Sequence, residues 1–429
     1  MSMAEERYYV PFTKEMKENY TILVPNMLTL HFRLLIQVFK NDGFNMELLE
    51  TDDPSIIETG LKYVHNDTCY PAILVIGQFI SALQSGKYDP HKTALIYFQT
   101  GGGCRASNYI NLLRKALKKA GLDYVPVISM SLSALEDHPG FKLSVPLMVR
   151  LLHAVLFGDV LMSLKNQVKP YEINPGETER VAAEETQKLA DLMKRDPSFV
   201  ARTPAIYRQI IEAFAAIPRR EEKKVRVGIV GEIYVKFSPL GNNHLEQLLV
   251  DEGAEVVLPG LLDFLIFGIY VKLRDTKLYG IKKLRYPVMK LIYKFLLRKQ
   301  RQLIGAIKSD GRFRAPTPFE HIVELSHEVI DTGVKMGEGW LLPAEMLELN
   351  DSGVHNIICA QPFGCLPNHI CGKGMMKPIK DRNPNVNIVA IDYDAGATRV
   401  NQENRLKLML ANARRIQQEK REAERSATA

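Results

Sequence analysis

The sequence predicts an α/β protein made of two parallel-sheet units with helical insertions. Short apolar runs alternate with amphipathic stretches of about 10–20 residues in the first third of the chain. The pattern becomes helical over 141–223, and the strand-like runs return at 225. The length of 429 residues fits two or three units, each able to bury its own core.

The first unit is expected to span 1–140, with a helical segment at 141–223 after it. Its strands are expected at 21–25, 46–49, 93–99 and 125–130. The amphipathic stretches 30–40 and 106–120 have helical periodicity. This alternation is typical of βαβ units, which form parallel sheets.

The second unit is expected to span 224–415. Its strands are expected at 225–230, 255–258, 355–360 and 387–391. Helices are expected at 243–252, 261–308 and 401–415. Gly253 should end the first of these, because glycine readily takes the left-handed conformation past a helix end. The charged tail 416–429 is expected to fray.

The composition excludes several classes of protein. A hydrophobic content of 46% with 24% charged residues excludes collagen-like, low-complexity and disordered chains. The N-terminus, MSMAEERYYVPF, lacks the apolar core of a signal peptide, and the most apolar stretch, 257–271, contains Asp263 and is too short to span a bilayer. Five cysteines are too few for a disulfide scaffold in a chain of this length, and because their number is odd they cannot all form pairs. We therefore expect a cytoplasmic protein without a membrane partner, whose thiols are free, catalytic or metal-bound.

Positive charge is concentrated in the insertion 261–314 of the second unit. Residues 271–314 contain fourteen Lys or Arg against two Asp, a net charge of +12, whereas the whole chain carries +7. One interpretation is a solvated helix face. The other is a docking surface for an acidic partner protein or for the phosphates of a ligand such as CoA. No nucleic-acid partner is expected, since no helix-turn-helix, zinc-finger or RRM signature accompanies the charge.

Several common catalytic motifs are missing. The sequence contains no GxxxxGK[ST], HExxH, GxSxG or CxxC. A glycine-rich loop at 100–103 lies between a predicted strand and a predicted helix, where backbone N–H groups can hold an anion. It does not form GxGxxG.

Three of the five cysteines follow or lie among Gly, Pro and Asn residues at the ends of predicted strands: Cys69, Cys104 and Cys365. Open α/β sheets bind ligands beyond the carboxyl ends of their strands. Thiolates select zinc, copper(I) or iron–sulfur clusters, and thiolates from distant loops suit a cubane because each binds a different iron. Alternatively, each cysteine is a small buried hydrophobe. Cys359 and Cys371 flank Cys365 and offer a local cluster loop as a further alternative.

Six segments of the chain resemble the 2-hydroxyacyl-CoA dehydratase subunit superfamily. They are NDTCYPA, TGGGCRASNYINLLRKAL, VGIVGEIYVKFSPLGNNHLEQLL, GEGWLL, QPFGCLPNHICGKG and NIVAIDYDAGATRVNQENRLKLML, which run in family order from about residue 20 to 410. The chain is most similar to the dehydratase-like part of activase-related, double-cubane-cluster proteins. The resemblance implies two Rossmann-like lobes with a cleft between them that holds a 4Fe–4S cluster, ligated by Cys69, Cys104 and Cys365. The chain departs from the family pattern at Cys104, where glycine precedes the cysteine and relatives more often have a proline.

The resemblance also implies a function. In such systems an ATP-dependent activase, here expected on a separate chain, drives a low-potential electron onto the cluster. Dehydratases pass it to a hydroxyacyl thioester to form a ketyl radical that acidifies a β-proton, and other relatives reduce small molecules with a larger double-cubane cluster. We expect an iron–sulfur dehydratase-like or reductase enzyme of anaerobic metabolism, with acyl-CoA as a candidate substrate, in a homo- or heterodimer. The alternatives are a non-catalytic electron-transfer subunit and a metal-free α/β binding protein.

Three further residues are candidates for catalysis. Arg105 follows Cys104 and would stabilise a reduced cluster or a substrate carbonyl, or else cap the loop. Glu232 follows the strand 225–230, where a general base would face the crevice, or else it caps a helix. His369 would assist proton transfer or bind phosphate, or else satisfy backbone groups of its turn.

Overall fold

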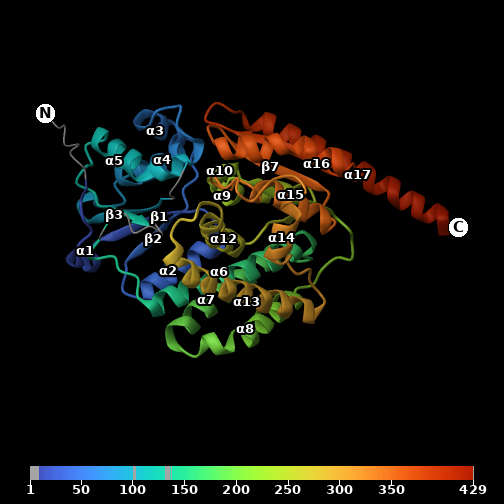
Figure 1. Cartoon of the computed structure of the whole chain (residues 1–429), viewed down its shortest axis with the longest axis horizontal. Helices are drawn as coiled ribbons and strands as arrows, with labels where there is room; N and C mark the ends of the chain where they lie inside the picture. Colours follow the sequence, from blue (N-terminus) through green and yellow to red (C-terminus); the bar gives the residue numbers. More distant parts are fainter. Residues whose placement is uncertain (1–8, 100–102, 131–135, 137, 429) are drawn as a thin grey trace.

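The computed structural model describes residues 9–99, 103–130, 136 and 138–428. It contains two four-stranded, all-parallel sheets flanked by helices, so the predicted α/β fold with two parallel-sheet lobes is confirmed (Figure 1). Most of the glycine-rich loop at 100–103 lies outside the described residues.

The first lobe is built on a sheet in the order β2-β1-β3-β4. Its strands are β1 (Thr21–Pro25), β2 (Met46–Leu49), β3 (Thr93–Phe98) and β4 (Val127–Met130). Its helices are α1 (Lys14–Asn19), α2 (Thr29–Asn41), α3 (Ser55–Tyr63), α4 (Tyr70–Gln84), η1 (Pro90–Lys92), η2 (Arg105–Asn108) and α5 (Tyr109–Lys119). Ile22 of β1 pairs with both Met46 and Ala94. Because side chains alternate along a strand, Ile22 faces the large core that contains α2, and Leu23 faces the core that contains α4 and α5.

The second lobe repeats this strand order as β6-β5-β7-β8. Its strands are β5 (Val225–Gly231), β6 (Ala254–Val257), β7 (Asn356–Pro362) and β8 (Asn387–Tyr393). Its helices are α9 (Ile233–Phe237), α10 (Pro239–Asn242), α11 (Leu245–Asp251), α15 (Leu341–Asp351), η5 (Asn368–Gly372, a π-helix), η6 (Lys373–Met375), α16 (Met376–Arg382) and α17 (Arg399–Thr428). Val227 of β5 pairs with Val256 of β6 and with Asn356 of β7.

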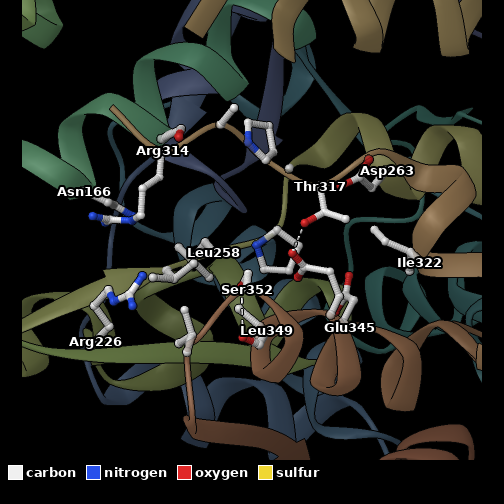
Figure 2. Close-up of a pocket in the computed structure, with 18 of the residues that line it drawn as sticks. Asn166, Arg226, Leu258, Asp263, Arg314, Thr317, Ile322, Glu345, Leu349 and Ser352 are labelled. Atoms are coloured by element: carbon white, nitrogen blue, oxygen red, sulfur yellow. Dashed lines mark hydrogen bonds between the residues drawn. The ribbon is translucent and has the colours of Figure 1, made fainter. Parts of the chain in front are cut away.

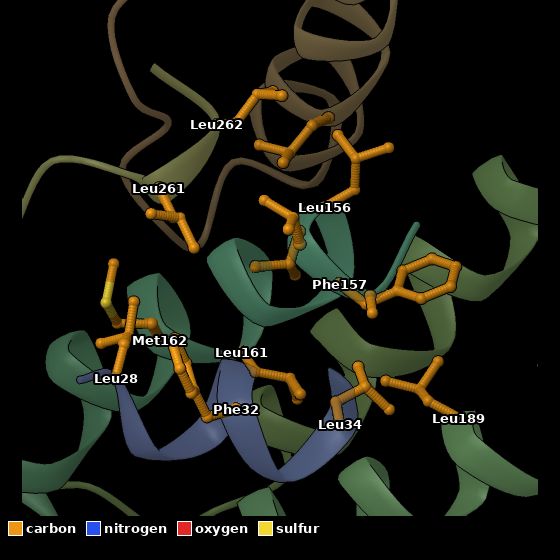
Figure 3. Close-up of a cluster of buried hydrophobic side chains, with 14 of the residues drawn as sticks. Leu28, Phe32, Leu34, Leu156, Phe157, Leu161, Met162, Leu189, Leu261 and Leu262 are labelled. Carbon is orange, nitrogen blue, oxygen red and sulfur yellow. The ribbon is translucent and has the colours of Figure 1, made fainter. Parts of the chain in front are cut away.

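A layer of helices joins the two lobes. It comprises α6 (Val145–Val168), η3 (Lys169–Tyr171), α7 (Glu177–Arg195), α8 (Phe199–Ala215), α12 (Leu261–Tyr279), η4 (Lys283–Arg285), α13 (Tyr286–Asp310) and α14 (Phe319–Ser326). Their apolar side chains form one core with the α2 face of the first sheet (Figure 3). In Figure 3, Leu156 and Leu161 of α6 lie between Leu34 of α2 and Leu262 of α12. The helices of 141–223 and the basic insertion 261–314 therefore share a single core.

The sequence located all eight strands to within about two residues at each end, but it misjudged several helices. It missed α3 and α4, and the helical stretch 261–308 is divided into α12 and α13. The segment 106–120 opens with the 3₁₀ turn η2 before α5 begins. The last helix, α17, continues through the tail that we expected to fray and reaches Thr428 (Figure 1). The tail is rich in Glu, Arg, Gln and Ala, which are good helix formers, and Arg415 pairs with Glu419 one turn later.

Within the described part of the chain, one helical segment is long and apolar enough to cross a membrane. It runs over Val145–Tyr171 with a mean hydropathy of 1.7, and 67% of its apolar window is buried inside the protein. Such burial is typical of the central helix of a soluble protein.

Asp159 anchors this central helix to its neighbours. Its carboxylate accepts hydrogen bonds from the backbone N–H groups of Leu261 (2.7 Å) and Leu262 (2.9 Å) at the start of α12, and it lies 2.8 Å from His31 Nε2 on α2. Gly158 permits this approach, since a Cβ there would lie 2.4 Å from the His31 ring. One buried carboxylate thus fixes three helices against each other.

Asp159→Ala is expected to lower the free energy of unfolding by about 3–5 kcal/mol, because His31 and two backbone donors lose their acceptor inside the core. Urea denaturation followed by circular dichroism measures this loss. The control is Asp381→Ala, which removes an exposed carboxylate paired with Lys377 and should cost at most about 1 kcal/mol. Equal losses in the two variants would contradict the anchoring role of Asp159.

Candidate functional site

The candidate site forms where the two sheets present the carboxyl ends of their central strands. The chain leaves β1 and β3 toward opposite faces of the first sheet, and it leaves β5 and β7 toward opposite faces of the second. Such switch points are where open α/β sheets bind ligands. Cys104 follows β3, Cys365 follows β7, and Glu232 directly follows β5. Both lobes therefore supply a cysteine from the equivalent strand.

The loops of Cys69 and Cys365 are in direct contact. The backbone N–H of Tyr70 donates to the carbonyl oxygen of Phe363 at 3.0 Å. Gly364 has a φ of +72°, and a Cβ at this position would lie 3.1 Å from the Cα of Cys69. A side chain there would separate the two loops, so glycine is needed both for the turn and for the contact.

Cys104 joins the same site through the segment that precedes α15. A Cβ added to Gly337 would lie 4.0 Å from Cys104 Sγ and 3.0 Å from Pro367 Cγ, two residues after Cys365. The backbone N–H of Gly103 also lies 3.2 Å from Met336 Sδ. We call Cys69, Cys104 and Cys365, together with Glu232 and Glu338, the thiol site.

Burial keeps the three thiols protonated at neutral pH. It raises the pKa of Cys104 to about 11, and the negative charges of Glu338 and Glu232 add to the effect. Burial also raises the pKa of Cys365, and the charges of the same two carboxylates add a smaller effect. The pKa of Cys69 is raised by burial, and the Tyr109 hydroxyl and the Arg105 guanidinium partly oppose this shift. A metal that binds these sulfurs would have to displace their protons.

Two tyrosines of the first lobe support Cys69. The Tyr109 hydroxyl lies 2.9 Å from Cys69 Sγ, and its ring stacks on that of Tyr97 with centroids 5.2 Å apart. Tyr97 belongs to β3, which leads to Cys104. The stack therefore holds the position of Cys69 relative to the strand that carries the second thiol.

Two carboxyl groups lie at the start of α9, beside the thiols. Glu338 accepts from the backbone N–H of Ile233, and Glu232 accepts from that of Val235, both at 2.9 Å. Burial and the neighbouring Glu338 raise the pKa of Glu232 to about 8. Lys236 opposes the shift, but its ammonium is bound to Glu345 at 3.0 Å. This pair can therefore hold a proton next to the thiols at neutral pH.

The structure places the other two predicted catalytic residues at the edge of the site. Arg105 is exposed and donates to the backbone carbonyl of Asp67, so it links the loops of Cys104 and Cys69. His369 lies in η5 with an exposed side chain, and its backbone N–H donates to the carbonyl of Cys365 at 3.1 Å. Of the three candidates, Glu232 is the one whose carboxyl charge acts on all three thiols.

Cys359 and Cys371 belong to a different environment. Both are buried in the apolar core between the second sheet and α15. Cys359 Sγ lies 3.4 Å from Asn368 Oδ1, and burial raises its pKa to about 12. The five thiols thus divide into three in the thiol site and two in this core. The prediction that Cys69 lies at a strand end is wrong, because Cys69 directly precedes α4 and follows α3.

The donor chemistry of the thiol site fits an iron–sulfur cluster better than a single ion. Among the residues that the structure describes, no three His, Cys, Asp or Glu side chains are grouped closely enough to hold one metal ion. A cubane has a different requirement, because each thiolate binds a different iron and the sulfurs need not converge on one point. Three soft thiols from separate loops are the type of donor that such a cluster takes.

Two residues of the site were not singled out from the sequence. Glu338 lies in the string GEGWLL, between two glycines with positive φ, and no pattern linked it to Glu232. Tyr109 lies five residues after Cys104, and its aromatic ring could as well have been part of a helix core. Their roles depend on contacts between segments far apart in the chain.

The comparisons with known proteins do not identify the chain. No protein-family model matches it, and no curated protein matches it significantly.

Glu232→Gln is expected to make the free energy of unfolding less dependent on pH. The folded protein binds the Glu232 proton more tightly than the unfolded chain does, so this contribution is complete below about pH 4.5 and is lost as the pH rises through about 8. Glutamine retains the bond to Val235 but does not ionise. Urea denaturation at about pH 5.5 and about pH 8.5 measures the difference. Glu419→Gln, on the exposed end of α17, is the control, and a wild-type pH dependence in Glu232→Gln would contradict the shifted pKa.

Proposed function

We propose that the protein is the iron–sulfur component of an ATP-activated, low-potential electron-transfer system, acting as a 2-hydroxyacyl-CoA dehydratase-like or reductase enzyme. The observation that carries the proposal is the meeting of Cys69, Cys104 and Cys365, three thiols from two lobes, at the switch points of the two sheets. The resemblance of the surrounding segments to the dehydratase superfamily supports it.

In this proposal Cys69, Cys104 and Cys365 hold a 4Fe–4S cluster. When bound, the cluster supplies a low-potential electron and one iron without a protein thiolate, which can act as a Lewis acid. A double-cubane cluster is the larger alternative, but the three thiols of the thiol site fit a single cubane more simply. Cys359 and Cys371 pack in the core of the second lobe and are not needed as ligands.

The groups around the thiols have proposed roles in proton transfer and charge balance. Glu232 and Glu338 share protons beside the thiols, so one of them can serve as the acid or base for a bound substrate. Arg105 supplies a positive charge next to Cys69 and Cys104, which would stabilise a reduced cluster. His369 is the exposed group nearest in sequence to Cys365 for a second proton transfer.

An activase on a separate chain is the proposed electron donor. The tip of the α12–α13 hairpin exposes basic side chains, including Lys282, Lys283 and Arg285, around Leu284, which is 97% exposed. The hairpin adjoins the thiol site through Lys335, which pairs with Asp275 of α12 and precedes Met336 and Gly337. This hairpin is therefore the proposed surface for an acidic activase.

The rim of the thiol site offers a second, apolar surface for a partner chain. Its exposed apolar side chains are Val334, Met336, Phe363, Leu366 and Ile370. Such a surface suits a homo- or heterodimer that shields the site from water and oxygen. Five free cysteines fit a cytoplasmic location, where thiols stay reduced.

Protein purified without oxygen is expected to contain about four irons per chain and to show the EPR signal of a reduced cubane after treatment with dithionite. Cys365→Ser is expected to lose most of this iron. Cys371→Ser changes a buried thiol outside the thiol site and should keep it.

Iron analysis and EPR of the three proteins decide the assignment. Wild-type iron content in Cys365→Ser would remove Cys365 from the ligand set. If wild-type protein contains no iron after anaerobic preparation with iron and sulfide supplied, the remaining hypothesis is a metal-free α/β binding protein. Iron-loaded protein that accepts electrons but converts no acyl-CoA thioester would favour the electron-transfer subunit.

Reversal of the hairpin charges is expected to slow reduction by the activase about tenfold or more at low salt, because charge complementarity steers association. The variant combines Lys282→Glu, Lys283→Glu and Arg285→Glu. The measurement is the rate at which the cluster absorbance bleaches when the activase and ATP are added. The matched control reverses three exposed bases on α7, Lys188, Lys194 and Arg195. Equal rates for both triple variants would place the docking surface elsewhere.

A further inference from the structure

A cavity of about 100 Å³ lies at the other side of the second lobe (Figure 2). It is enclosed by the end of α6, the end of β6, the segment 314–317 and α15. It also reaches Arg226 in the first half of β5 and Val354 before β7, whereas Cys104 and Cys365 follow the carboxyl ends of the strands. The cavity is therefore separate from the thiol site.

Two arginines form one wall of this cavity. The Arg226 and Arg314 side chains both line the cavity and lie on the same side of it in Figure 2. Gln167 fixes the second arginine from α6: its Oε1 accepts from the Arg314 backbone N–H at 2.8 Å and its Nε2 donates to the Arg314 carbonyl at 3.1 Å. Arg226 donates to the Gly353 carbonyl at 3.1 Å. The backbone of Arg314 and the side chain of Arg226 are thus held in place before any ligand binds.

Asn166 adds a third donor on the same side. It is only 6% exposed, it lines the cavity, and its Nδ2 has no hydrogen-bond partner. Buried polar groups nearly always find a partner, so an unpaired amide in the wall of a cavity points to a ligand. Figure 2 shows Asn166, Arg226 and Arg314 together, opposite Asp263 and Glu345.

The charges around the cavity leave the arginine wall positive. Glu255 pairs with Arg314 and accepts from the Tyr171 hydroxyl at 2.7 Å, so it balances one of the two guanidinium groups. The carboxyls on the opposite wall already have partners. Glu345 binds Lys236, Asp263 accepts from Gln300, and Glu348 accepts from the Thr317 hydroxyl. Burial raises the pKa of Glu348 to about 7, so this third carboxyl is only partly ionised at neutral pH. Burial also raises the pKa of Asp263, which reduces its negative charge.

We propose that Arg226, Arg314 and Asn166 bind a phosphate group. Guanidinium groups form paired hydrogen bonds with phosphate oxygens, and the amide of Asn166 supplies a further donor from the buried side. The volume is enough for several waters or one compact anion. The Arg314 side chain is 49% exposed, so the remainder of a phosphomonoester can extend into solvent. This site does not depend on the cluster.

Isothermal titration calorimetry of the full chain in a phosphate-free chloride buffer tests the site. The probes are inorganic phosphate and adenosine monophosphate. We expect wild-type protein to bind at least one of them, and Arg314→Gln and Asn166→Leu to weaken that binding at least tenfold. Arg312→Gln, two residues away and paired with Asp310 and Glu212, is the matched control and should keep wild-type affinity.

Each result has a definite meaning. Tighter binding of adenosine monophosphate assigns the site to a nucleotide, and equal or weaker binding assigns it to free phosphate. The absence of binding of both probes at millimolar concentration overturns the proposal. Wild-type affinity in folded Arg314→Gln also overturns it, and this variant decides alone if Asn166→Leu does not fold, because its side chain is half exposed and easily replaced.

Discussion

The buried carboxylate of Asp159 is the interaction on which the arrangement of the two lobes depends. Its helix, α6, buries mostly apolar side chains, and His153 and Asn166 are its other buried polar residues. Hydrogen bonds to α12 and the contact with His31 on α2 fix the register. Because α2 belongs to the first lobe and α12 to the insertion of the second, this group ties the two lobes together beside the apolar core that they share.

The thiol site follows from the repeated strand order. Each sheet has its switch point between its two central strands, and each third strand leads into a cysteine loop. Gly364 and Gly337 then allow loops of different lobes to approach without side chains between them. Beside these loops, burial and the charge of Glu338 raise the pKa of Glu232 to about 8.

The sequence predicts what depends on local pattern. Apolar runs located the strands, and Gly, Pro and Asn placed Cys104 and Cys365 in loops after strands, whereas Cys69 lies between two helices. It did not reveal the partners of those loops. Glu338 is more than one hundred residues from Glu232, and Arg314 is 88 residues after Arg226, so only the packing of the helical insertion brings each pair together. The high charge of the tail suggested fraying, but the helix propensity of its residues prevails and α17 continues through it.

The order of the thiols along the chain has a consequence for biosynthesis. Cys69 and Cys104 lie in the first quarter of the polypeptide, and Cys365 follows 261 residues later. At about 5–20 residues per second, a ribosome exposes the first two sulfurs on the order of tens of seconds before the third. A nascent chain thus lacks a complete donor set until Cys365 has emerged from the ribosome. Any metal cofactor that needs all three thiols can be completed only after that point.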